Sequence, residues 1–238
     1  MNINLLVSLL EMSINTYHDE DLPSLIYKYG YDRDGMRCKL FDFHGALVLA
    51  IKGTSLNILG YELGETSEND KEMVNIMFKK CKRHRQERDC EYLKKIKFDK
   101  LGYLSKLQNI LTYVKYLYPN KKIFLTGHSL GGTLASLLSP TFDLQCVTFS
   151  SPGDLYISRI LQIRNKKIKE NLSHFGMCND SIFSGRCDRL CKLLGYSVDT
   201  VKHNGRVYCL KIRPNIKSVI FHNSSVLLTY LKKLLHQN

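Results

Sequence analysis

The pentapeptide Gly127-His128-Ser129-Leu130-Gly131 constrains the fold more than any other feature of this 238-residue chain. It follows a short apolar run, Ile123–Thr126, and precedes a helix-like segment, Thr133–Leu138. A strand that turns so sharply into a helix needs glycine at positions 127 and 131, because side chains there would collide with the turn. The pattern predicts a strand-turn-helix unit that exposes the Ser129 hydroxyl at the tip of the turn.

Strands and helices are expected to alternate through most of the chain. The apolar runs Ala46–Ile51 and Gln145–Phe149 are typical of strands buried on both faces of a sheet. Apolar residues at helical spacing predict helices over 2–17, 104–117 and 224–235. Further strands are predicted over 36–43 and 206–212. The alternation predicts one α/β domain over residues 1–238, with a mostly parallel central sheet and helices on both faces.

Two segments depart from this alternation. Residues 61–100 are polar and contain a basic run from Lys79 to Arg88, which predicts a partly helical surface insertion or lid-like segment. Residues 171–205 are polar and contain Cys178, Cys187 and Cys191, and we assign no strand to them.

The Ser129 hydroxyl is a poor nucleophile unless a base accepts its proton. In the order serine, acid, histidine, the base belongs in a loop after the last strand, where His222 precedes the C-terminal helix. His203 precedes a strand and His236 is close to the C-terminus, so both are poorer candidates. The acid must lie between serine and base. Topology favours Asp180 but leaves Asp154 open, because Asp154 follows the strand 145–149.

The charge of the chain predicts an anionic partner. Lys and Arg number 35 against 22 acidic residues, which gives a net charge of +13. Such a charge attracts nucleic acid or acidic lipid. No zinc-finger, RRM or helix-turn-helix signature is present, so a nucleic-acid partner is not expected. A lipid or membrane surface, including anionic phospholipid, is the expected partner, and the sequence does not indicate an oligomeric state.

Sequence features bearing on the compartment point in opposite directions. The apolar stretch Ile3–Leu10 is too short for a signal peptide, and residues 123–142 contain glycines and a proline that do not suit a spanning helix. A native N-terminus would make the chain soluble, and cytoplasmic or membrane-associated. Eight cysteines, among them Cys187, Cys191 and Cys209 as disulfide candidates, instead suit an oxidising compartment. No Cys/His pair completes a zinc site with Cys187 and Cys191, so neither metal nor cofactor is expected.

Four blocks of the chain resemble the class 3 lipases, and within them the fungal vacuolar autophagic-body lipases. The elbow block Thr126–Leu137 is the most specific, and Ile51–Ser55 resembles the oxyanion segment of that group. Val147–Asp154 is similar to its next strand and turn, and Asn179–Cys187 to its catalytic acid segment. The resemblance implies an α/β-hydrolase fold.

The same resemblance implies roles for individual residues. It implies Ser129 as nucleophile, Asp180 as acid and His222 as base, and makes Asp154 a turn residue. It places Thr54 in the oxyanion hole, together with the N–H of Leu130, which the elbow pattern also aims at developing negative charge. The family usually has proline after the acid, whereas this chain has Ser181.

Together these features predict a serine lipase or phospholipase that hydrolyses glycerolipid esters through an acyl-enzyme. The main alternative is a catalytically silent relative that binds membranes or protein partners. A peptidase or thioesterase on the same fold is a further alternative, which a substrate panel would exclude.

Overall fold

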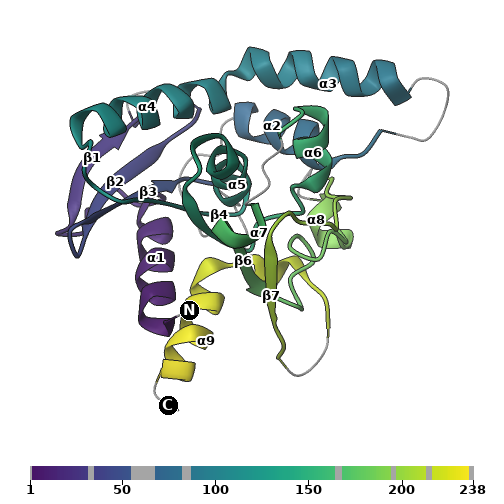
Figure 1. The fold of residues 1–238 in the computed structure, drawn as a ribbon. Coiled ribbons are helices and arrows are strands. Elements are labelled where there is room, and N and C mark those ends of the chain that lie inside the picture. Colours follow the sequence, from purple (N-terminus) through teal and green to yellow (C-terminus); the bar gives the residue numbers. More distant parts are fainter. Residues whose placement is uncertain are drawn as a thin grey trace.

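The computed structural model describes residues 2–31, 35–54, 68–81, 87–163, 168–193, 197–212 and 216–235. Within them the chain forms a seven-stranded sheet in the order β1-β2-β3-β4-β5-β6-β7 (Figure 1). β2 is antiparallel to its two neighbours, β1 and β3, whereas each pair of neighbouring strands from β3 to β7 is parallel. The strands are β1 Leu25–Tyr29, β2 Cys38–Phe43, β3 Ala46–Ile51, β4 Ile123–His128, β5 Gln145–Phe149, β6 Leu172–Met177 and β7 Arg206–Leu210.

Helices cover both faces of this sheet. On one face, α1 (Ile3–Asn15) and α9 (Ser224–Leu235) lie side by side (Figure 1). The other carries α2 (Glu68–Phe78), α4 (Tyr103–Leu117), α5 (Leu130–Phe142) and α6 (Leu155–Ile160). The remaining elements are α3 (Glu87–Leu101), α7 (Ile168–Asn171), α8 (Arg189–Leu193) and the 3₁₀-helix η1 (Val219–His222).

The period-2 geometry of β3 divides its apolar side chains between two cores. Leu47, Leu49 and Ile51 pack under α4 and α5, whereas Val48 and Ala50 pack under α1 and α9. A strand buried in this way must be apolar at every position, which is the pattern its sequence carries. The predicted α/β architecture, mostly parallel and covered on both faces, is confirmed.

The structure corrects three sequence-based assignments. The segment 171–205 contains β6, which pairs with β5 and β7, although we assigned it no strand. β1 was not predicted at all. Within the segment 61–100, α2 is not superficial, because Met73, Met77 and Phe78 are buried in the core; α3 buries only Phe98. Residues 61–67 and 82–86 of that segment lie outside the described residues.

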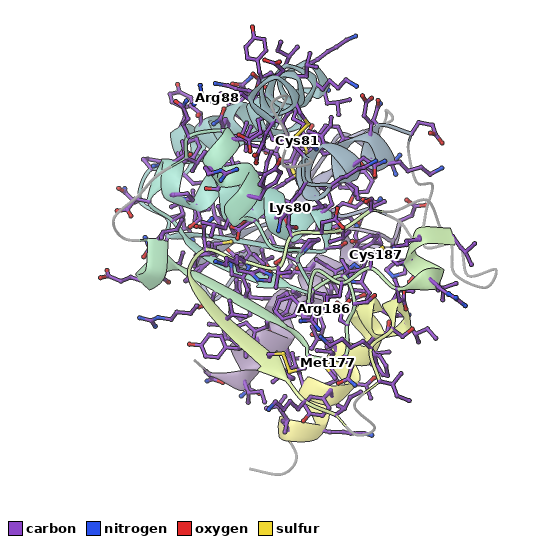
Figure 2. All side chains as sticks on the ribbon, turned by 90° about the vertical axis from the view of Figure 1, so that its right-hand side faces the viewer. Lys80, Cys81, Arg88, Met177, Arg186 and Cys187 are labelled. Atoms are coloured by element: carbon purple, nitrogen blue, oxygen red, sulfur yellow. A yellow bond between two sulfur atoms is a disulfide. The ribbon has the colours of Figure 1, made fainter. Side chains whose placement is uncertain are left out.

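Three disulfides join cysteines that are 9, 31 and 4 positions apart in the sequence. They are Cys81–Cys90, Cys178–Cys209 and Cys187–Cys191, and Figure 2 labels Cys81 and Cys187. All three candidate cysteines named from the sequence are therefore bonded, with Cys178 as the partner of Cys209. Among the described residues, no helix is long and apolar enough to cross a membrane.

Candidate active site

Ser129 lies at the tip of the turn between β4 and α5, where the sequence predicted it. Its backbone has φ 56° and ψ −127°, a conformation that side-chain-bearing residues rarely adopt. The turn can be this tight because positions 127 and 131 are glycines. A Cβ on Gly127 would lie 2.6 Å from the backbone of Gly131, and a Cβ on Gly131 would overlap the carbonyl of Ile51 at the end of β3. Close packing of three backbone segments therefore holds the serine in its strained conformation.

Ser129, His222 and Asp180 form one continuous hydrogen-bonded chain. The hydroxyl of Ser129 lies 2.7 Å from Nε2 of His222, and Nδ1 of His222 lies 2.8 Å from Oδ2 of Asp180. Because a carboxylate only accepts, Nδ1 carries the proton and Nε2 is left to accept from the serine. All three residues are buried.

The acid is held beside the base by a short pairing of two loops. Asp180 follows β6 and forms an isolated parallel bridge with Ser218, the residue before η1. The N–H of Ser218 donates to Asn179 O, and the N–H of Ser181 donates to Ser218 O. The second carboxylate oxygen of Asp180 accepts from the N–H of Ile182 at 2.8 Å. The loop pairing fixes which acid His222 meets.

Asp154, the other candidate acid, lies in a different buried network. Its carboxylate accepts from the Ser136 hydroxyl at 2.8 Å and from the backbone and side chain of Asn204. It lies 3.9 Å from Nε2 of His174, whose Nδ1 bonds the hydroxyls of Thr148 and Ser151. Asp154 therefore ties α5 to the segment before β7, and the structure does not bring it to His222.

The histidine that was rejected as a base belongs to this second network. His203 bonds the carbonyl of Ser151 through Nε2 at 2.9 Å and packs against the ring of His174. His203 is not part of the hydrogen-bonded chain from Ser129 through His222 to Asp180. His236 lies outside the described residues.

The two residues predicted for the oxyanion hole adjoin the serine: Leu130 follows it, and a Cβ on Gly53, the residue before Thr54, would lie 3.2 Å from Cβ of Ser129. Leu130 begins α5, and its backbone N–H is among the first N–H groups of the helix, which have no partner within it. Thr54 follows the turn after β3 and is 5 % exposed. Its hydroxyl is buried without a hydrogen-bond partner among the described residues. An unpaired buried hydroxyl costs free energy, and this one has hydrogen-bonding capacity that the described residues leave unused.

Two buried histidines near the sheet are held neutral. Burial, and secondarily the neighbouring His222, lowers the pKa of His128 to about 3. Burial lowers the pKa of His174 to about 4, although the charge of Asp154 opposes that effect. Both imidazoles are therefore neutral hydrogen-bonding groups at ordinary pH.

Sequence reasoning missed Tyr17. Its hydroxyl lies 3.1 Å from Nδ1 of His128 and accepts from the N–H of Gly53 at 3.1 Å. The residue was assigned only to the end of the first helix, because nothing in the local sequence indicates a contact 111 positions away.

The fold, the elbow and the chain order serine, acid, histidine define an α/β-hydrolase. A family model described as "Lipase (class 3)" matches residues 56–153. A protein of Saccharomyces cerevisiae (strain YJM789) named "Putative lipase ATG15" is 37% identical over 205 residues, covering 75% of this chain and 39% of that protein. A relative of the same name from Kluyveromyces lactis is 31% identical over 221 residues, covering 82% and 41% respectively.

The chain belongs to the class 3 lipase family, as its sequence blocks indicated. It spans about two fifths of the length of the curated relatives it matches. Among solved structures, it is similar to a lipase from Rhizopus microsporus var. chinensis, at 11% identity and a TM-score of 0.49, covering 92% of this chain and 85% of that one. It is also similar to the Lip2 lipase of Yarrowia lipolytica, at 16% identity and a TM-score of 0.44, covering 75% and 73%.

Proposed function

We propose that this chain is a serine ester hydrolase that acts on glycerolipids. The observation that carries the proposal is the chain of hydrogen bonds from Ser129 through His222 to Asp180, at 2.7 and 2.8 Å. A serine, an imidazole in the accepting tautomer and a buried carboxylate are the components of nucleophilic acyl transfer.

In the proposed mechanism, His222 accepts the Ser129 proton while Oγ attacks the ester carbonyl carbon. Asp180 stabilises the imidazolium that forms. The N–H groups of Thr54 and Leu130, with the Thr54 hydroxyl, hold the negative oxygen of the tetrahedral intermediate. The alcohol leaves with the proton from His222. Water, deprotonated by the same imidazole, then hydrolyses the acyl-enzyme and restores the serine.

The exposed face of α3 supports phospholipid as the substrate class. Tyr92, Leu93 and Ile96 are 66 %, 56 % and 46 % exposed at helical spacing, and Arg88 and Lys97 are exposed beside them. Apolar side chains bordered by cations suit an anionic lipid surface, where each cation contributes about 1 kcal/mol.

The position of α3 brings this face to the edge of the sheet that carries the serine. Glu91 of α3 pairs with Arg159 of α6, the helix that follows β5, and parallel β4 and β5 end at the same edge. Figure 1 shows α3 along the outside of the molecule, and Figure 2 labels Arg88 at the top of its view and Lys80 nearer the middle. A bound vesicle would thus lie near the elbow.

The test is acyl release from vesicles and from a triolein emulsion by the wild type and by Ser129→Ala. We expect release by the wild type alone, faster from phosphatidylserine-containing vesicles than from triolein. Faster release from triolein would overturn the phospholipid assignment, whereas the proposal of a serine esterase would still stand. If wild type and variant were equally inactive on every ester but both bound anionic vesicles, the proposed enzyme function would be overturned. The chain would then be assigned a membrane-binding role.

A further inference from the structure

A second hydrogen-bonded chain connects four segments around the serine. The N–H of Gly53 donates to the hydroxyl oxygen of Tyr17 at 3.1 Å, and that hydroxyl lies 3.1 Å from Nδ1 of His128. Nε2 of His128 lies 2.9 Å from the backbone carbonyl of His222. The chain therefore joins the oxyanion turn, the end of α1, the elbow and the residue that carries the base.

The direction of every bond in this chain follows from its partners. The carbonyl of His222 can only accept, so Nε2 of His128 donates to it. His128 is buried and neutral, because burial lowers its pKa to about 3, so Nδ1 has no proton and accepts from the Tyr17 hydroxyl. The Tyr17 oxygen in turn accepts from Gly53. Each of these groups is thereby satisfied in one arrangement only.

Close packing makes the oxyanion turn depend on this chain. A Cβ on Gly53 would overlap both the Tyr17 hydroxyl and the carbonyl of His128, and it would lie 3.2 Å from Cβ of Ser129. The ammonium of Lys52 lies 5.1 Å from the centre of the Tyr17 ring and donates to Gly53 O at 3.1 Å. The phenol is thus contacted by the two residues that precede Thr54, the candidate oxyanion donor.

We infer that Tyr17 is a positioning residue, which sets the oxyanion turn relative to the serine and to the backbone of the base. This inference rests on the proposed function. Removing the hydroxyl leaves the N–H of Gly53 without its acceptor and Nδ1 of His128 without its donor. The turn then loses its fixed distance from Ser129, so the tetrahedral intermediate is stabilised less while the ground-state ester binds as before.

The test compares Tyr17→Phe with the matched control Tyr31→Phe. The Tyr31 hydroxyl donates to the carbonyl of Thr16 at 2.6 Å, one residue from Tyr17, and it is not part of the chain of bonds from Gly53 to His222. Hydrolysis of p-nitrophenyl butyrate is measured, with kcat expressed per molecule that a fluorophosphonate labels, so that misfolded protein does not count. Inhibition by phenylboronic acid, which mimics the tetrahedral intermediate, is measured on the same samples.

For Tyr17→Phe we expect kcat to fall about tenfold, the boronic acid to bind more weakly by the same factor, and KM to stay within about twofold. Tyr31→Phe is expected to match the wild type. Equal values of kcat for the two variants, or a change in KM alone, would overturn the positioning role while leaving the esterase intact. A wild type that neither hydrolyses the ester nor reacts with the fluorophosphonate would overturn the proposed function itself, and this inference with it.

Discussion

The hydroxyl of Ser129 lies 2.7 Å from Nε2 of His222, although 93 residues separate them in the chain. At this distance a proton can pass from oxygen to nitrogen without movement of either segment. The backbone of Ser129 is meanwhile held at a positive φ by the glycines around it. The two side chains thus already have the geometry that the proposed proton transfer needs.

The two candidate acids should respond differently to the same substitution. Asp180→Asn replaces the acceptor of His222 Nδ1–H and favours the wrong imidazole tautomer, so kcat should fall about 10⁴-fold with little loss of stability. Asp154→Asn should instead lower the melting temperature, because that carboxylate accepts from Ser136 and Asn204. Its kcat per fluorophosphonate-labelled molecule should stay near the wild-type value. The reverse pattern in ester hydrolysis would make Asp154 the catalytic acid.

Removing the Thr54 hydroxyl should separate activity from stability. Among the described residues this buried hydroxyl has no partner, so Thr54→Val should leave the free energy of unfolding unchanged or raise it. If the hydroxyl binds the oxyanion, kcat should fall by about 10². Urea denaturation and ester hydrolysis of the same sample test this. A variant that is fully active would leave only the Thr54 N–H as a donor from this residue.

The elbow glycines should tolerate no side chain. Gly131→Ala places a methyl group against the carbonyl of Ile51, so we expect a loss of at least about 3 kcal/mol in the free energy of unfolding. Gly45→Ala is the matched control, because its φ is +82° but no atom lies within 4 Å of the added Cβ. It should cost only about 1–2 kcal/mol. A loss for Gly131→Ala no larger than that for Gly45→Ala would show that the close approach to Ile51 costs little, because Gly131 lies in α5 and has no positive φ.

Stability should decrease as the pH falls below 6.5. The unfolded chain protonates its histidines near pH 6.5, whereas burial lowers the pKa of His174 to about 4 and that of His128 to about 3 in the folded protein. Above pH 6.5 these two histidines are neutral in both the folded and the unfolded chain, so their protonation does not change the free energy of unfolding. Between pH 6.5 and 4 each lowers the free energy of unfolding by roughly 1.4 kcal/mol per pH unit.

Urea denaturation at a series of pH values measures this slope. His174→Gln should reduce this slope by the share of one histidine. A His174→Gln slope equal to that of the wild type would show that His174 protonates alike in the folded and unfolded chains.

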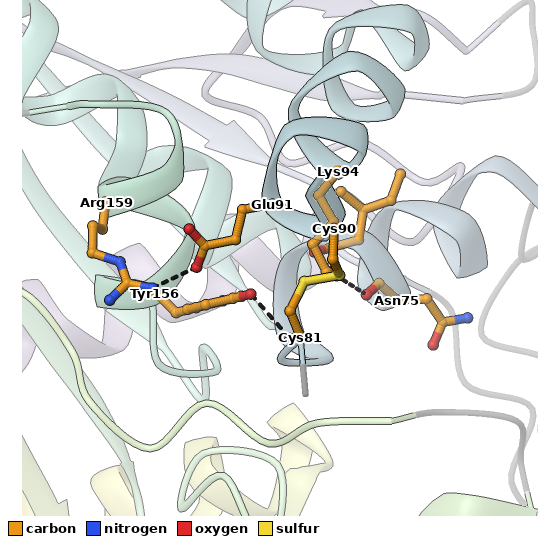
Figure 3. Close-up of a disulfide and its surroundings, with 8 residues drawn as sticks. Asn75, Cys81, Cys90, Glu91, Lys94, Tyr156 and Arg159 are labelled. Carbon is orange, nitrogen blue, oxygen red and sulfur yellow. Dashed lines mark hydrogen bonds and ion pairs between the residues drawn. A yellow bond between two sulfur atoms is a disulfide. The ribbon is translucent and has the colours of Figure 1, made fainter. Parts of the chain in front are cut away.

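The Cys81–Cys90 disulfide should hold α3 in place. It joins the end of α2 to α3, where Lys94 donates to the carbonyls of Asn75 and Ile76 and Tyr156 accepts from the N–H of Cys81 (Figure 3). Closing this short loop stabilises by about 2–3 kcal/mol, so Cys81→Ser with Cys90→Ser should unfold at lower urea concentration.

The same double variant tests the role of α3 at lipid surfaces. If α3 docks on lipid, binding to anionic vesicles should weaken while hydrolysis of a soluble ester persists. The comparison is with untreated wild type, because a reductant would also open Cys178–Cys209 and Cys187–Cys191. Unchanged vesicle binding by the variant would place lipid contact elsewhere on the molecule.

The elbow and the alternating strands could be predicted because their causes are local. A strand that turns into a helix around Ser129 requires Gly127 and Gly131, and a strand buried on both faces requires the apolar run Ala46–Ile51. β6 was missed for an equally physical reason. It buries His174 on hydroxyls of the neighbouring strand and the turn after it, so its sequence lacks the apolar pattern of a core strand.

The sequence by itself determined the nucleophile turn, the α/β architecture and the short set of residues from which acid and base could come. Only the tertiary structure showed that Asp180, and not Asp154, lies against His222, because that contact depends on the pairing of Asp180 with Ser218. It alone brought Tyr17 to His128. Such contacts join segments far apart in the chain, and they form only if the sheet places those segments side by side. No local pattern of residues encodes that placement.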